Sequence, residues 1–150
     1  MQRFSFRLQT VANLREKEEN LRKEELAEAR RHLLTEEEHL SNLYEKKRLY
    51  QSQLFFSQGE KLDLPGIALL YAYLDDLERQ ITLQGKRVEQ AEAEVENRRQ
   101  ILVKASQNRK ILEKLREKRY LDYRHEANRQ EQVFLDEIAG RLSVPGRNGL

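Results

Sequence analysis

Hydrophobic residues recur along the second half of the chain at steps that alternate between three and four. The run begins at Ile67 and ends at Leu112, and it does not miss a step. A repeat of 3.5 residues keeps one narrow apolar stripe facing a partner helix, and the two helices wind around each other left-handedly. The pattern therefore predicts a coiled coil. Its seam positions are Ile67, Leu70, Leu74, Leu77, Ile81, Gln84, Val88, Ala91, Val95, Arg98, Leu102, Ala105, Arg109 and Leu112.

A second apolar stripe runs through the first half of the chain. Its early part, which starts at Phe4, is one residue out of phase with its later part, so we expect the seam to slip by one residue between Leu21 and Leu26. No Pro or Gly precedes Gly59, which predicts one unbroken helix. The predicted coiled-coil core consists of Val11, Leu21, Leu33, Leu40, Leu54, Ile67, Leu74, Ile81, Val88, Val95, Leu102 and Leu112.

The segment between the two stripes carries the signals of a helix break. Gly59 can end the first helix, Asp63 can cap the second, and Pro65 suits a first helical turn. Gly140 is expected to end the second helix. The predicted bounds are about 5–57 for the first helix, 58–64 for the loop, 65–139 for the second helix and 143–150 for a flexible tail, with residues 1–142 forming a single rod.

A loop this short turns the chain back on itself, so the expected fold is all-α, an intramolecular antiparallel coiled coil or helical hairpin. Leu40 then faces Ile81, and Leu33 faces Val88. Charge favours the same alignment modestly, because residues 16–45 hold ten acidic and five basic side chains whereas residues 98–129 hold eleven basic and four acidic ones.

The second helix is longer than the first and should overhang it. Residues 120–139 would extend past the first helix by about 30 Å at 1.5 Å per residue. Apolar side chains keep a helical spacing there, through Phe134 and Ile138. A helix that presents an apolar stripe without a partner is a typical protein-binding surface.

Composition excludes several classes of protein. Charged residues make up 36% of the chain and hydrophobic residues 38%, which is too few for a thick core. The net charge is only +2, and the chain contains no Cys for a disulfide or a thiolate metal site. No apolar run approaches the roughly 20 residues that span a bilayer. We therefore expect a cytoplasmic protein.

Residues that could carry chemistry are few. His32, Glu36 and His39 share a helix face but form a weak metal-ligand set, and no closed pocket is expected to shift the pKa of any carboxylate. The sequence therefore predicts neither an enzyme nor a cofactor. Basic residues in 98–129 could contact phosphates, and Tyr120 could stack on bases, yet interleaved acidic residues favour a charged coiled-coil exterior with a protein partner.

Three groups of residues, in order along the chain, match motifs of a known family. They are Phe4, Phe6, Leu8, Gln9, Val11, Leu14, Arg15 and Glu18, then Tyr71, Tyr73, Leu74, Leu77, Glu78 and Ile81, and finally Tyr123, Glu126, Glu131, Gln132, Asp136, Glu137 and Ala139. With these motifs, nearly the whole chain resembles the flagellar export protein FliJ family.

The resemblance implies a stalk-like component of the bacterial flagellar type III export apparatus, at the cytoplasmic side of the cell membrane. Such proteins bind the centre of the FliI-type ATPase hexamer and promote its assembly, contact the FlhA-type export gate and escort export chaperones. The gate-binding residues would be Tyr73, Leu77, Gln80 and Gln84. The ATPase-binding residues would be Phe4, Phe6, Leu8, Arg15, Tyr120, Tyr123, Glu131, Gln132, Phe134, Asp136 and Glu137.

Two alternatives remain open at the level of sequence. One is the equivalent stalk protein of a virulence injectisome, and the other is a nucleic-acid-binding coiled coil. Salt dependence separates the second from the FliJ-like function, because phosphate contacts weaken steeply with salt whereas apolar helix-in-groove contacts do not.

Overall fold

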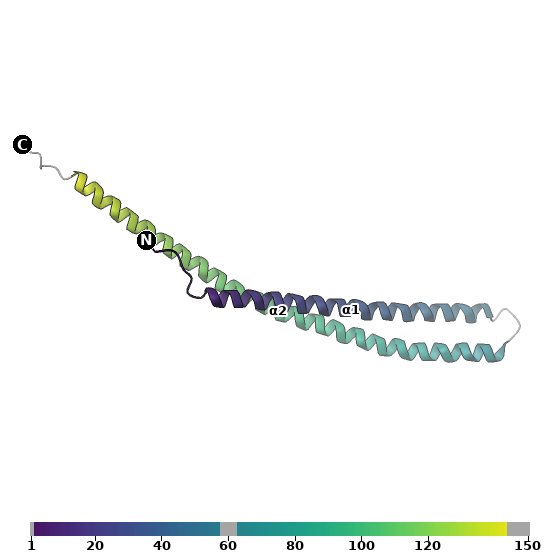
Figure 1. The fold of residues 1–150 in the computed structure, drawn as a ribbon. Helices are drawn as coiled ribbons and strands as arrows, with labels where there is room; N and C mark the ends of the chain where they lie inside the picture. Colours follow the sequence, from purple (N-terminus) through teal and green to yellow (C-terminus); the bar gives the residue numbers. More distant parts are fainter. Residues whose placement is uncertain (1, 58–62, 144–150) are drawn as a thin grey trace, which may run out of the picture. The chain divides into compact units, whose positions relative to one another are not determined.

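The computed structural model describes residues 2–57 and 63–143, and their regular structure is entirely α-helical (Figure 1). Helix α1 spans Gln9–Ser57 (49 residues) and helix α2 spans Leu64–Ser143 (80 residues). The two long helices pack against each other, which confirms the predicted all-α helical hairpin. Residue contacts divide the chain into two compact units, residues 20–104 and residues 1–19 with 105–150.

Within residues 20–104, α1 and α2 run antiparallel along each other (Figure 1). The Tyr50 and Tyr73 rings stack with their centroids 5.8 Å apart. Further from the break, the side-chain amide of Gln84 donates to the backbone oxygen of Glu36 at 3.0 Å. A third contact joins Arg98 Nη1 to Glu25 Oε2 at 3.1 Å. Residue numbers fall on α1 as they rise on α2, as an antiparallel pair requires.

The second unit repeats this arrangement. Arg109 Nε donates to Glu19 Oε2 at 2.5 Å, and Arg116 Nε donates to Gln9 Oε1 at 3.2 Å. Beyond α1, the ring of Phe4 lies edge-on to that of Tyr120 with the centroids 5.2 Å apart. The N-terminal residues therefore continue the antiparallel path along α2.

The seam of α1 does not slip, which corrects the predicted core at its N-terminal end. Leu21 is 49% exposed and Val11 is 38% exposed, although both were expected in the core. The least exposed positions of α1 instead keep the 3.5-residue repeat through Ala12, Arg15, Glu19, Arg22, Leu26, Ala29, Leu33, Glu36, Leu40, Leu43, Lys47, Tyr50 and Leu54. Charged side chains occupy several of these positions, so the apolar residues alone gave the wrong phase.

The ten other predicted core residues are buried or half-buried. They are Leu33, Leu40, Leu54, Ile67, Leu74, Ile81, Val88, Val95, Leu102 and Leu112. Buried apolar side chains on both helices complete the seam, among them Leu26 and Leu43 on α1 and Leu77 and Ala91 on α2. The core is thus a single line of contacts rather than a layer.

Helix α1 begins at Gln9, four residues later than expected, because the residues before it pack differently. Phe4, Phe6 and Leu8 are half-buried or buried, whereas the residues between them are exposed. Side chains that alternate in this way belong to a non-helical segment with a period of two. The backbone amide of Gln9 donates to the carbonyl of Phe6 at 3.1 Å, where the helix starts.

Helix α2 starts where capping chemistry predicts. The backbone amide of Gly66 donates to Asp63 Oδ1 at 3.3 Å, and Pro65 lies in the first turn. At its other end the helix passes through Gly140 and continues to Ser143, so this Gly does not terminate it. Most of the predicted loop, including Gly59, and residues 144–150 of the predicted tail lie outside the described residues.

Gly85 lies inside α2 without a packing reason. A Cβ atom built at Gly85 meets nothing within 4 Å among the described residues. Because Gly in a helix interior costs up to about 1 kcal/mol relative to Ala, we expect Gly85→Ala to raise the free energy of unfolding by about 0.5–1 kcal/mol. Urea unfolding followed by circular dichroism measures this change, and a loss of stability would contradict it.

None of the helices in the described ranges 2–57 and 63–143 is both long enough and apolar enough to cross a membrane.

Candidate partner-binding surfaces

The N-terminal strap, residues 2–8, is held against α2 by aromatic contacts. The ring of Phe4 lies 5.2 Å from that of Tyr120 and 5.4 Å from that of Tyr123, measured between centroids. The guanidinium of Arg116 sits 5.9 Å from the Phe4 ring centroid, at the range of a cation–π contact. The Tyr123 hydroxyl donates to the carbonyl of Gln2 at 2.7 Å. One Phe side chain therefore organises the strap.

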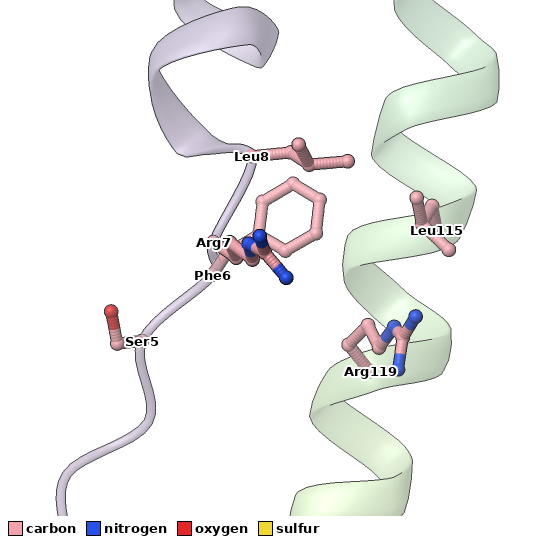
Figure 2. Close-up of a pocket in the computed structure, with 6 residues that line it drawn as sticks. All are labelled: Ser5, Phe6, Arg7, Leu8, Leu115 and Arg119. Atoms are coloured by element: carbon pink, nitrogen blue, oxygen red, sulfur yellow. The ribbon is translucent and has the colours of Figure 1, made fainter.

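A groove opens between the strap and α2 (Figure 2). In Figure 2 the Phe6 ring lies between Leu8, from the strap side, and Leu115, from α2. The groove has a volume of about 470 Å³, and Ser5, Arg7 and Arg119 complete its lining. It combines an apolar floor with cationic walls.

The last part of α2 exposes apolar side chains. Every residue from 128 to 143 is exposed. Phe134 is 60% exposed, and Ile138, one turn further on, is 37% exposed. Their spacing from Tyr123 and Ala127 puts all four on one helix face. Among the described residues nothing covers the outer part of this face, which we call the overhang stripe (Phe134 and Ile138).

The predicted ATPase-binding residues divide into two groups. Phe4, Phe6, Leu8, Tyr120 and Tyr123 meet at the strap. Glu131, Gln132, Phe134, Asp136 and Glu137 are exposed on α2 beyond the strap. Arg15 belongs to neither group, because its guanidinium pairs with Glu18 on its own helix at 3.0 Å. The structure thus brings together four of the five aromatic residues of the predicted set, along with Leu8.

The predicted gate-binding stripe is only partly available. Leu77 is 5% exposed and Gln84 2% exposed, so both belong to the seam and cannot meet a partner while the hairpin is closed. Tyr73 and Gln80 are exposed, although the Tyr73 ring stacks on Tyr50. Two residues of the predicted stripe therefore lie on the seam and two beside it, and the role of the stripe at the gate stays a prediction.

Two apolar residues that the sequence analysis missed accompany Tyr73 and Gln80. Leu69 and Leu83 are each more than half exposed. Steps of four, seven and three along α2 place Leu69, Tyr73, Gln80 and Leu83 on one face. The signal was present in the sequence as apolar residues off the heptad, and we call this set the α2 outer stripe.

Polar layers interrupt the seam. The side chain of Glu19 is 7% exposed and that of Arg109 is 28% exposed where they pair, and Arg109 also reaches Glu113 at 2.9 Å. The Gln84 amide donates to both the backbone oxygen and the carboxylate of Glu36. Buried polar pairs of this kind fix the register of coiled coils at a cost in stability.

Resolved pKa shifts are confined to ion pairs and have no catalytic pattern. The pKa values of Glu45, Glu96 and Glu126 are lowered, chiefly because each carboxylate accepts a hydrogen bond from an Arg three residues later. Hydrogen bonding to Glu19 raises the pKa of Arg109. These carboxylates therefore stay ionised at neutral pH.

The His-containing face of α1 does not form a metal cluster. His32 Nε2 lies 3.8 Å from Glu36 Oε1, and the nearby His39 is exposed. No group of three or more His, Cys, Asp or Glu side chains in the part of the chain that the structure describes could hold a metal ion. Glu36 instead receives the Gln84 amide.

Removing the Phe4 ring should release the strap without melting the helices. We expect Phe4→Ala to weaken the docking of the strap on α2 by about 1–2 kcal/mol. This loss is smaller than for a fully buried Phe, because the Phe4 ring is only half-buried. The side-chain NMR resonances of Phe6 and Leu8 should move to random-coil positions while helix content stays constant. Phe56→Ala makes the same change at a 71% exposed ring and should leave the strap unaffected. Unchanged resonances in Phe4→Ala would show that the ring does not hold the strap.

Comparison with known proteins gives one family. The family model described as "Flagellar FliJ protein" matches residues 4–147, nearly the whole chain. No curated protein and no solved structure matches the chain. The match covers both helices and the strap from Phe4 onward. This chain therefore belongs to the flagellar FliJ family, whose members are components of the flagellar export apparatus.

Proposed function

We propose that the chain is a non-enzymatic stalk that enters the ring of a FliI-type export ATPase and promotes its assembly and activity. In the same proposal it couples the ring to an FlhA-type export gate and escorts export chaperones. It acts in the cytoplasm, at the base of the flagellum on the inner side of the cell membrane.

The overhang stripe is the observation that carries the proposal. Phe134 and Ile138 expose apolar surface on a helix of about 30 Å, counted over residues 124–143 at 1.5 Å per residue. A single narrow helix with apolar residues on one side suits insertion into a cavity formed by other subunits. Exposed apolar surface of this kind marks protein contacts.

The strap adds a second contact surface to the same unit. Its aromatic cluster is built from Phe4, Tyr120 and Tyr123, and the Arg116 guanidinium covers one ring. The strap therefore makes the chain wider and more basic, where the overhang begins, than a single helix would be. Contacts at both the strap and the overhang stripe would align the chain within a ring.

For the export gate we propose the α2 outer stripe. Leu69, Tyr73 and Leu83 offer exposed apolar side chains, and Gln80 is held by a 2.6 Å hydrogen bond to Asp76. This surface includes Tyr73 and Gln80, the two exposed residues of the gate-binding stripe that the family resemblance implies. It belongs to residues 20–104, whereas the ATPase-directed surface belongs to the other compact unit.

ATP turnover by the cognate flagellar ATPase, measured with and without the chain, tests the proposal. We expect the chain to stimulate turnover and to increase the fraction of ATPase in rings seen by sedimentation. The absence of both effects, with a helical chain confirmed by circular dichroism, would overturn the ATPase part of the proposal. Binding of Leu83→Asp to the gate protein tests the other part separately.

A further inference from the structure

The groove between the strap and α2 has the dimensions of a binding site. Its volume of about 470 Å³ lies in the range of about 300–1,000 Å³ that is typical of ligand sites. Two chain segments far apart in sequence form it, since Phe6 and Leu8 come from the N-terminus and Leu115 and Arg119 from α2 (Figure 2). The site therefore exists only while the strap is docked.

The floor of the groove is apolar and partly accessible. Phe6 is 9% exposed, while Leu8 and Leu115 are half-buried. In Figure 2 the Leu8 side chain and the Phe6 ring both extend from the strap side toward α2, where Leu115 lies. An aliphatic side chain that entered the groove would meet carbon atoms from both segments, which favours an apolar anchor.

The walls of the groove carry positive charge that is not neutralised locally. Arg7 and Arg119 are exposed, and within residues 2–57 and 63–143 neither forms an ion pair. In the same unit Arg15, Arg109 and Arg129 each bind a Glu within 3.0 Å, whereas Arg124 forms no ion pair among the described residues. No carboxylate lines the groove. Each free guanidinium offers several donors in a geometry that matches a carboxylate.

We infer that this groove binds an acidic peptide segment in which an aliphatic side chain lies between carboxylates. The aliphatic side chain packs against Leu8 and Leu115, and the flanking carboxylates accept hydrogen bonds from Arg7 and Arg119. A nucleic acid fits less well, because stacking of bases needs exposed aromatic faces. Phe6, the one aromatic residue that lines the groove, is only 9% exposed.

The inference rests on the proposed function only for the identity of the protein that carries the segment. It goes beyond that function because it assigns the chemistry of one contact and the two side chains that select it. The peptide titration contains no ATPase. A negative result would therefore overturn the inference about the groove without affecting the proposed stimulation of ATP turnover.

The probe is the peptide Gly-Glu-Ile-Glu-Gly, titrated into the full chain while the methyl resonances of Leu8 and Leu115 are followed by NMR. We expect saturable shifts of both residues with a Kd below about 1 mM. Arg7→Glu and Arg119→Glu should each weaken binding by about tenfold or more, as expected for loss of a charge-assisted hydrogen bond. Arg124→Glu changes the charge equally on α2 outside the groove lining and is the matched control.

Two further peptides and one variant separate the parts of the inference. Gly-Gln-Ile-Gln-Gly lacks the charges and Gly-Glu-Ser-Glu-Gly lacks the anchor, so both should bind at least about tenfold more weakly. Phe4→Ala should also lose binding, because it frees the strap, and its helix content shows whether the hairpin is intact. Equal binding of all three peptides, equal loss in Arg124→Glu, stronger binding of single-stranded DNA at the same site, or no saturable shift would each overturn the inference.

Discussion

Leu43→Ala should lower the free energy of unfolding by about 2–3 kcal/mol. Leu43 is 4% exposed and is one of the few buried residues on α1. Truncation removes its apolar contacts with α2 and leaves a cavity that a two-helix seam can close only partly. Because the core is one line of side chains, no second layer compensates. Thermal and urea unfolding followed by far-UV circular dichroism measure the loss.

Leu34→Ala is the matched control for this prediction. The chemical change is identical, but Leu34 is 56% exposed and lies off the seam. Surface substitutions of this kind usually change stability by less than about 0.5 kcal/mol. If both variants lose similar free energy of unfolding, exposed and seam positions of α1 contribute equally to stability. That result would contradict a coiled-coil seam.

Phe134→Asp combined with Ile138→Asp should abolish stimulation of the export ATPase, the largest functional effect we expect. Both side chains are exposed and lie off the seam between the helices, so the substitutions remove little packing from the described chain. In a ring they would bury two carboxylates against an apolar wall, and burial of unpaired charge costs several kcal/mol. Turnover measured with an excess of the variant should equal the rate of the ATPase alone.

Asn128→Asp is the control for the overhang variant. It adds a carboxylate at an exposed position on the same stretch of α2, away from Phe134 and Ile138 on the helix surface. Stimulation should stay close to that of the wild type. If Asn128→Asp loses stimulation as fully as the double variant, net charge rather than the overhang stripe determines binding.

The second half of the fold could be predicted from the sequence because its seam is mostly apolar. From Ile67 to Leu112 the heptad places an aliphatic residue at most positions, so hydrophobicity alone defines the phase. The start of α1 could not be predicted in this way. Its seam holds Arg15 and Glu19, and the buried Glu19 carboxylate pairs with Arg109 on the opposite helix.

The binding surfaces were predictable to a smaller extent. Strict alternation of Phe4, Phe6 and Leu8 is a signal of period two, yet the helical stripe that continues after Leu8 concealed it. The residues implied for the gate by family resemblance included Leu77 and Gln84, whose heptad positions already placed them on the seam. The groove beside Arg7 and Arg119 required the path of the strap, which no periodicity specifies.

The stoichiometry of ATPase activation tests the central claim most directly. Turnover at a fixed concentration of the cognate ATPase is measured while the chain is added in increasing amounts. A stalk in the centre of a hexamer predicts that stimulation saturates at one chain per ring, and that the Phe134→Asp, Ile138→Asp variant neither stimulates nor competes. Saturation at one chain per ATPase subunit would contradict a central stalk and would place the chain on the outside of the ring.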